Sequence, residues 1–137
     1  MTAHADQISF PGGLIEENET SQQAALRELQ EELGIGRDKV RVLGRMSPLY
    51  VFASNFQITP YVAVAKSLPE FIANPAEVAE VLQLPLATLV DGCNYGAHEI
   101  CRVEMSFRAP HIACNRHRIW GATCMILGEL VAILSDT

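Results

Sequence analysis

Three glutamates, Glu28, Glu31 and Glu32, form the densest acidic cluster in the sequence and are spaced to act together on a helix. At about 100° per residue, their carboxylates project from neighbouring positions. Glu28 and Glu32 are like charges four residues apart, and all three lie in the last turns, where the helix dipole disfavours anions. A hard divalent cation such as Mg²⁺ takes carboxylate oxygens as ligands and would remove both penalties. The cluster is therefore a candidate metal site.

The helix that carries the cluster is marked at both ends. Thr20 followed by Gln23 makes a capping-box pattern, and Gly34 suits the position after the last helical residue. Arg27 lies one turn before Glu31 and is placed to orient that carboxylate. An apolar stripe at helical spacing is formed by Ala25, Leu26, Leu29 and Leu33. By composition alone, such a helix also fits a solvated acidic face, which is common in proteins.

The spacing around the helix favours the metal site over the solvated face. The fixed positions are Gly13, Glu19 and Arg27-Glu28-Leu29-x-Glu31-Glu32-x-Gly34-Ile35. This series resembles the box of the Nudix hydrolases, a family that cleaves nucleoside diphosphates linked to another group. So many residues at fixed spacing rarely match by chance. The resemblance implies that Glu28, Glu31 and Glu32 bind Mg²⁺ or Mn²⁺, with Arg27 and Glu19 supporting the loop–helix–loop.

Segments outside the box resemble the coenzyme A diphosphatases within this family. They are His4-x-x-Gln7-Ile8-x-Phe10-Pro11-Gly12-Gly13, Asn55-Phe56-x-Ile58-Thr59-Pro60-Tyr61-Val62, Asn74-Pro75-x-Glu77-Val78 with Leu84-Pro85-Leu86, and Ile119-Trp120-Gly121-Ala122-Thr123. The resemblance implies hydrolysis of the coenzyme A pyrophosphate to 3′,5′-ADP and 4′-phosphopantetheine. Two alternatives stay open: a Nudix hydrolase for ADP-ribose or a nucleotide sugar, and a non-catalytic Nudix-like binding module.

The catalytic group implied by this chemistry contains Glu28, Glu31, Arg27 and Glu77. A base must accept a proton from the attacking water. Glu28, Glu31 and Glu77 are the candidates for that base, and the sequence does not choose between them. For Glu77 the alternative is an ordinary solvated residue.

The residues expected to bind substrate lie before the acidic helix and late in the chain. Gly12 and Gly13 would let the backbone approach a ligand closely. A 3′-phosphate would need cationic partners, and the nearest cluster in the sequence is Arg108, Arg116 and Arg118. The alternative for these arginines is a solvated loop.

Length and charge limit the classes of partner. The 137 residues are 49% hydrophobic, carry a net charge of −6 and contain no evident linker or repeat. We expect a single domain over residues 1–137. We expect no nucleic-acid partner, because nucleic-acid footprints are basic. We also expect no membrane partner, since the most apolar segment, residues 119–134, is short and contains Glu129.

The cysteines are scattered and form no CxxC pair, which favours reduced thiols in a cytoplasmic protein. His111, Cys114 and His117 stand three residues apart and invite a zinc interpretation. They fall in an arginine-rich predicted loop with no fourth ligand at a usual spacing, so we predict no zinc site.

Alternation and turn residues predict the remaining elements. Strands are expected at residues 7–10, 40–46, 56–65 and 100–108, with Pro60 marking an edge or bulge. Helices are expected over residues 75–83 and 119–134, with a short helical turn at 85–91. This order favours an α/β fold, and the resemblance implies the Nudix α/β/α sandwich with a mixed sheet.

The coenzyme A diphosphatases begin with a strand and a basic segment before the His-x-x-Gln motif, and both are missing before His4. We therefore expect an N-terminally truncated sandwich with an uncovered sheet edge and apolar surface beside it. Unpaired edges and apolar patches favour pairing with another copy. The expectation is a homodimer of weak hydrolytic activity.

Overall fold

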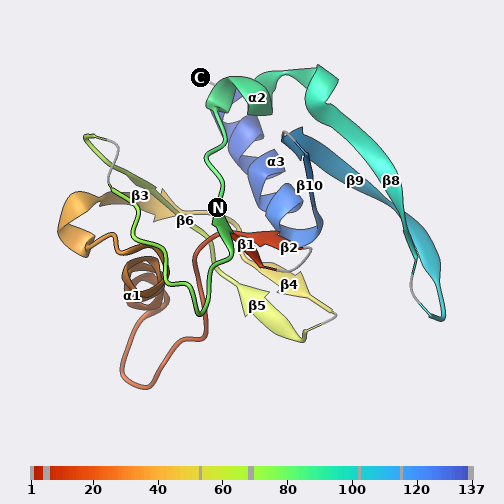
Figure 1. Ribbon diagram of the computed structural model, residues 1–137. Coiled ribbons are helices and arrows are strands. Elements are labelled where there is room, and N and C mark those ends of the chain that lie inside the picture. The colour runs from red at the N-terminus through yellow and green to blue at the C-terminus, as the bar shows by residue number, and fades with distance from the viewer. Residues whose placement is uncertain are drawn as a thin grey trace. The chain divides into compact units, whose positions relative to one another are not determined.

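The computed structural model describes residues 2–4, 7–52, 54–67, 70–101, 103–114 and 116–135, without the side chains of residues 2–4 and 7. The chain forms two compact units, residues 1–82 and residues 83–137 (Figure 1). The first unit contains the acidic helix. The prediction that residues 1–137 form a single domain stays a prediction.

The first unit is built from short antiparallel strands and one long helix. Strands β1 (Thr2–His4), β2 (Gln7–Ser9) and β7 (Glu80–Val81) form a sheet in the order β2-β1-β7. Strand β3 (Arg41–Arg45) pairs with β6 (Tyr61–Val64), and β4 (Leu49–Val51) pairs with β5 (Phe56–Ile58). Its buried apolar side chains are Ala24, Leu33, Ile35, Met46, Val78 and Leu82.

The strand predictions for this unit hold in two cases and fail in one. Strands β2 and β3 confirm the predictions at residues 7–10 and 40–46. The strand expected over residues 56–65 is wrong as a single element, because it is interrupted at Thr59 and Pro60 and forms β5 and β6. Proline has no N–H to donate to a ladder. Its carbonyl still accepts from the Met46 N–H at 2.9 Å.

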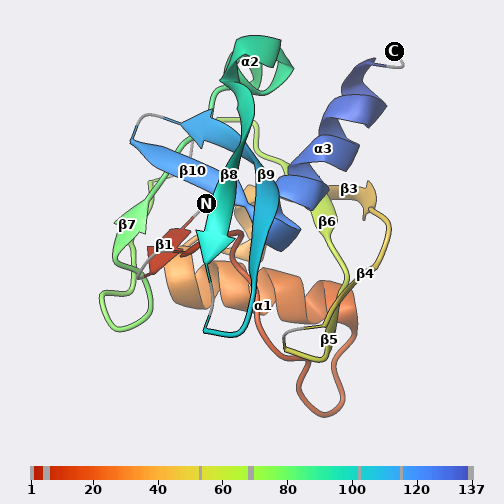
Figure 2. The ribbon, with the colours of Figure 1, turned by 90° about the vertical axis from the view of Figure 1, so that its right-hand side faces the viewer.

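Helix α1 (Ser21–Leu33), drawn in orange in Figure 2, begins and ends where the sequence predicts. Thr20 Oγ1 accepts from the Gln23 N–H at 3.1 Å, and Gln23 Oε1 accepts from the Thr20 N–H at 2.8 Å. Gly34 follows the helix with a left-handed φ of 68°. A Cβ at Gly34 would stand 2.8 Å from the Ile72 Cβ, so the turn requires glycine for both conformation and space.

The helix expected over residues 75–83 is wrong. The segment forms a turn that begins at Asn74 and then leads into β7. Asn74 Oδ1 accepts from the Ala76 N–H at 3.0 Å, and the Asn74 carbonyl accepts from the N–H groups of Glu77 and Val78 at 3.0 and 2.8 Å. Asn-Pro favours turn initiation and valine favours strands. Pairing of β7 with β1 then takes the backbone bonds that a helix would have used.

The second unit is a three-stranded antiparallel sheet with a helix packed on it. Strands β8 (Tyr95–Cys101), β9 (Ser106–Cys114) and β10 (His117–Trp120) lie in the order β10-β9-β8. Helix α3 (Gly121–Ser135) lies against β9 and β10 (Figure 1). The short helix α2 (Leu86–Val90) confirms the helical turn expected at residues 85–91. Of the helices that the structure describes, none combines the length and apolarity needed to cross a membrane.

The predictions for residues 100–120 need correction. The strand expected over residues 100–108 is a hairpin, with β8 ending at Cys101 and β9 beginning at Ser106. Residues 102–105 contain neither glycine nor proline, so alternation alone did not reveal the turn. The helix expected from residue 119 begins at Gly121, whose φ is 70°. The predicted loop at 111–117 belongs instead to β9, β10 and the link between them.

The expected mixed sheet is not found in the described ranges. Every strand pairing there is antiparallel, and the strands form four sheets of two or three strands. Strands that follow one another closely in the chain, such as β4 and β5, pair in this way because parallel pairing needs a longer crossover. The content of α-helices and β-strands agrees with the predicted α/β class.

Candidate functional site

Hydrogen bonds hold the segment before α1 against the helix and within its own turn. The Gly12 N–H donates to Glu32 Oε2 at 3.0 Å. Further along, the Glu16 N–H donates to Glu19 Oε1 at 2.8 Å, and the Glu19 N–H donates back to the Glu16 carbonyl at 3.3 Å. Asn18, at a φ of 65°, completes this turn. The loop is thereby closed before the helix begins.

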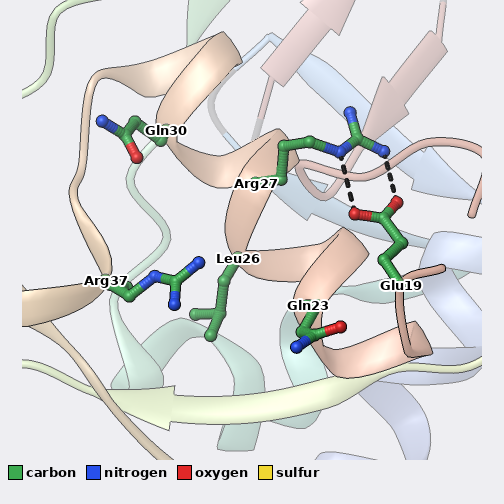
Figure 3. A pocket seen from close by; sticks show the side chains of 6 residues that line it. All are labelled: Glu19, Gln23, Leu26, Arg27, Gln30 and Arg37. Atoms are coloured by element: carbon green, nitrogen blue, oxygen red, sulfur yellow. Dashed lines mark hydrogen bonds and ion pairs between the residues drawn. The ribbon is translucent and has the colours of Figure 1, made fainter. Parts of the chain in front are cut away.

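Arg27 is the centre of the polar contacts between loop and helix. Its Nε and Nη2 donate to the two oxygens of Glu19 at 3.2 and 2.9 Å, the bidentate arrangement visible in Figure 3. Nη2 also donates to the Leu14 carbonyl at 2.9 Å, and Nη1 donates to Glu28 Oε1 at 2.8 Å and to Glu31 Oε2 at 3.2 Å. The side chains of Arg27 and Glu19 are 22% and 15% exposed. The hydrogen bond from Arg27 holds the pKa of Glu19 below its usual range, and Glu19 raises the pKa of Arg27.

A hollow of about 230 Å³ lies beside this contact. Figure 3 shows the six residues that line it: Glu19, Gln23, Leu26, Arg27, Gln30 and Arg37. Positions 23, 26 and 30 lie on the side of α1 turned away from positions 28 and 32, given 100° per residue. The hollow is therefore separate from the acidic cluster.

The acidic cluster contains the three predicted helix glutamates and gains a fourth from the Asn74 turn. The Asn74 N–H donates to the backbone carbonyl of Glu32 at 2.9 Å, and the Ile72 N–H donates to that of Leu33 at 2.9 Å. These bonds dock the turn on the end of α1. Burial raises the pKa of Glu32, and the negative charges of Glu28, Glu77 and Glu31 raise it further, against the Gly12 hydrogen bond. Glu77, predicted as a catalytic candidate, thus lies within electrostatic reach of Glu32.

The carboxylate oxygens of the acidic cluster are chemically suited to a hard divalent ion. The side chains of Glu28 and Glu31, however, face Arg27. Carboxylate oxygens are the ligands that Mg²⁺ and Mn²⁺ prefer. Gly13 leaves room for the Glu28 carboxylate, since a Cβ at position 13 would stand 2.5 Å from Glu28 Oε1. Within the described residues no group of three or more His, Cys, Asp or Glu side chains is arranged to hold a metal. Binding an ion through Glu28 and Glu31 would therefore require them to turn from Arg27.

The three predicted phosphate-binding arginines lie in the second unit and do not form one cluster. Arg108 is opposite Glu99 in the β8–β9 register, and Arg118 is opposite Ala113 in the β9–β10 register. Since neighbouring strand residues alternate between faces, Arg108 and Arg118 project from opposite faces of this sheet. Arg116 is exposed between β9 and β10. A shared role for all three is thus not favoured.

Alternation also separates His111 from Cys114 and His117, the other two residues of the zinc interpretation. His111 and Cys114 are three residues apart on β9, so their side chains lie on opposite faces. The expectation of no zinc site at His111, Cys114 and His117 agrees with this placement.

Two residues of the site were missed from the sequence. Asn74 organises the turn that carries Glu77, and the Asn-Pro pair was the signal for that turn. Glu16 lies 3.6 Å from Arg27 as a further ion partner, and no pattern in the loop distinguishes it from its neighbour Glu17.

Comparison with known proteins gives the family of this chain. Residues 2–98 match the NUDIX domain family. Similar proteins named "Uncharacterized Nudix hydrolase NudL" occur in Photorhabdus laumondii, 34% identical over 95% of this chain and 70% of the relative, and in Pectobacterium atrosepticum, 35% identical over 99% of this chain and 71% of the relative. The NudL protein of Citrobacter koseri is 34% identical over 95% of this chain and 68% of its own length. This chain is therefore a member of the Nudix hydrolase family.

Proposed function

We propose that the chain catalyses metal-dependent hydrolysis of a nucleoside diphosphate linked to another group. The observation that carries this proposal is the gathering of Glu28, Glu31, Glu32 and Glu77 near the C-terminal end of α1, where burial and then the charges of the other three glutamates raise the pKa of Glu32. Carboxylates held close together repel one another, and a divalent cation bound between them would relieve that repulsion. We assign Mg²⁺ or Mn²⁺ to Glu28, Glu31 and Glu32. When bound, the ion would supply charge neutralisation and polarisation at the pyrophosphate and would activate water.

We assign the role of general base to Glu77. Glu28 and Glu31 each accept a hydrogen bond from Arg27, at 2.8 and 3.2 Å. Glu77 is exposed and accepts only a long 3.4 Å bond from the Asn74 amide among the contacts described for its side chain. A base needs a lone pair that water can reach. Arg27 and Glu19 then act as positioning residues for the loop and for the two helix carboxylates.

The substrate we propose is coenzyme A, cleaved to 3′,5′-ADP and 4′-phosphopantetheine. The support is the resemblance of the segments around Phe10, Pro60 and Trp120 to the coenzyme A diphosphatases. We keep Arg108, Arg116 and Arg118 as candidates for the 3′-phosphate, and we expect only one of Arg108 and Arg118 to contact it. Comparing coenzyme A with its 3′-dephosphorylated form tests this role. Equal specificity constants would remove it from all three arginines.

A substrate panel with and without Mg²⁺ tests the reaction itself. The panel contains coenzyme A, ADP-ribose and a nucleotide sugar. Faster cleavage of ADP-ribose than of coenzyme A would favour the alternative pyrophosphatase. Metal-dependent turnover of none of them would favour a binding module.

Isosteric substitutions test the assigned residues. We expect Glu28→Gln and Glu32→Gln to abolish metal-dependent hydrolysis while the fold persists. We expect Glu77→Gln to retain Mn²⁺ binding and lose turnover. Glu17→Gln is the matched control, since Glu17 is an exposed glutamate in the loop that precedes α1. Near wild-type turnover in Glu28→Gln or Glu32→Gln would overturn the metal assignment.

We also propose that residues 1–137 work as one domain that self-associates as a symmetric dimer. The family match over residues 2–98 crosses the boundary between the two units at residue 82. In the first unit Leu14, Ile15 and Phe52 are 66%, 57% and 89% exposed, and apolar surface of this kind often marks a partner site. Light scattering that finds only monomer at assay concentrations would contradict the dimer.

A further inference from the structure

The β8–β9 hairpin brings two histidines into contact, and neither histidine has a role in the proposed hydrolysis. His98 lies opposite Ala109, and His111 lies opposite Gly96, so the two histidines are diagonal neighbours on one face. Their Nδ1 atoms are 2.8 Å apart, and their ring centroids are 4.8 Å apart with planes at 52°. Both side chains are half-buried.

Two imidazole nitrogens at this distance need a proton or a cation between their lone pairs. In a neutral pair, one Nδ1 carries the proton and donates it to the other. A metal ion is the second solution, because bonds of about 2.0 Å meeting near 90° place two nitrogens about 2.8 Å apart. A tetrahedral Zn²⁺ would need nitrogens about 0.5 Å further apart. The observed separation therefore suits the tetragonal geometry of Cu²⁺ and Ni²⁺.

We propose that His98 and His111 form a two-histidine site for a divalent transition metal ion of the Cu²⁺ and Ni²⁺ type, with water as the remaining ligands. The site is independent of the acidic cluster on α1 and takes a different class of metal. Imidazole nitrogen binds these ions, whereas Mg²⁺ selects oxygen ligands.

The surroundings of the pair favour this role. Both histidines project from the same face of the β8–β9 hairpin, with their Nδ1 atoms directed at one another. Imidazole nitrogen is a common ligand of Cu²⁺ and Ni²⁺. Gly96 leaves the space that the ring occupies, since a Cβ there would stand 2.9 Å from His111 Nε2.

One charge opposes the proposed ion and one aromatic ring can report it. Arg118 acts electrostatically on His111 from β10 and would repel a bound cation. Trp120, the only tryptophan in the chain, lies edge-on to His98 with ring centroids 6.1 Å apart. Cu²⁺ quenches indole fluorescence at short range, so Trp120 provides a direct signal for an ion at His98.

The test is a titration of the full chain with Cu²⁺, followed by Trp120 fluorescence and repeated with Ni²⁺ by calorimetry. Exposed Cys93 and Cys101 are alkylated first, because thiols also bind copper. We expect saturable quenching at one ion per chain, with Cu²⁺ bound more tightly than Ni²⁺ or Zn²⁺. Mg²⁺ at the same concentrations is expected to leave the fluorescence unchanged. Quenching that does not saturate would show an adventitious ion only and would overturn the site.

Variants separate chelation from nonspecific binding. We expect His98→Ala and His111→Ala each to raise the dissociation constant at least tenfold, and His117→Gln to leave it unchanged, since His117 lies on the opposite face of the sheet from His111. Gly96→Ala keeps both ligands but displaces the His111 ring, so we expect it to weaken binding as well. This variant provides the test if His98→Ala or His111→Ala fails to fold. Arg118→Gln should tighten binding. A dissociation constant within twofold of wild type in both His98→Ala and His111→Ala, or in Gly96→Ala, would refute the proposal.

Discussion

Gly13→Ala should separate metal binding from folding in the first unit. A Cβ at this position would stand 2.5 Å from Glu28 Oε1 and 2.7 Å from its Cδ, while ordinary contact begins near 3.4 Å. The carboxylate must therefore retreat by about 0.9 Å, because it is the end of a flexible side chain and the backbone around it is fixed. The Glu28 side chain is only 13% exposed, so few positions are open to it.

The size of the effect follows from the space that the added Cβ removes. An ion bound through Glu28 would need that carboxylate to turn from Arg27, and a Cβ at position 13 would restrict this movement. Metal–ligand distances tolerate only about ±0.2 Å, so a carboxylate held away from its place no longer serves the ion. Misplacement of a catalytic group by about 1 Å lowers the rate roughly 100-fold, or about 2.7 kcal/mol of transition-state stabilisation. Moving the side chain off its rotamer costs about 0.5–1.5 kcal/mol of folding stability. We expect kcat/KM to fall by two orders of magnitude while Tm falls by roughly 5 °C or less.

The assay measures Mn²⁺ affinity, coenzyme A hydrolysis and Tm on the same preparations. Gly44→Ala is the matched control, because a Cβ at Gly44 in β3 meets nothing within 4 Å. We expect this control to match wild type in all three measurements. Gly13→Ala with Mn²⁺ affinity and turnover within threefold of wild type would refute the place given to Glu28. An equal loss in Gly44→Ala would show that the assay reports a general effect of the substitution.

Three further predictions concern stability and coupling. Gly34→Ala must adopt a φ of 68° against Ile72, so we expect a loss of at least about 1 kcal/mol by urea unfolding and lower turnover from a displaced Asn74 turn. The pKa of Glu32 is raised in the folded state, so in metal-free protein its stabilisation is present below the unfolded pKa and is lost as pH rises through the folded pKa. Urea midpoints measured in chelator should therefore show a pH dependence that Glu32→Gln removes. If the chain is one domain, saturating Mg²⁺ should raise the unfolding midpoint reported by Trp120 in the second unit; a midpoint unchanged by Mg²⁺ would show that the units unfold separately.

The parts of the site that were predictable are those in which local sequence decides local structure. The capping box at Thr20 and the left-handed turn at Gly34 depend on residues within one helical turn, and both are present. The placement of Glu28, Glu31 and Glu32 on α1 follows directly from that helix. The proximity of Arg27 to Glu31 also followed from one-turn spacing.

The parts that were not predictable depend on partners distant in sequence. Residues 75–83 have a helical pattern of valines and leucine, and pairing with β1 converts their end to a strand. The docking of Asn74 on the Glu32 carbonyl joins segments far apart in the chain, and no local pattern announces it. The β8–β9 turn lacks glycine and proline, so its position is set by the cross-strand register. In these segments, tertiary contacts determined the secondary structure that local sequence propensity did not.

Because Arg27 donates hydrogen bonds to Glu28 and Glu31, its guanidinium acts as an internal counter-ion for the acidic cluster. On the proposed metal assignment, loading a divalent ion at these carboxylates would be an exchange, in which the Arg27 guanidinium would release Glu28 and Glu31 and retain Glu19 as its partner. The helix and its loop can form before any ion arrives, in contrast to zinc fingers, whose binding free energy is also their folding free energy. Such an exchange would also weaken retention of the ion, since each ion would displace an existing contact. A centre of this kind would fill and empty with the surrounding supply of free ion, while the polypeptide around it stayed folded.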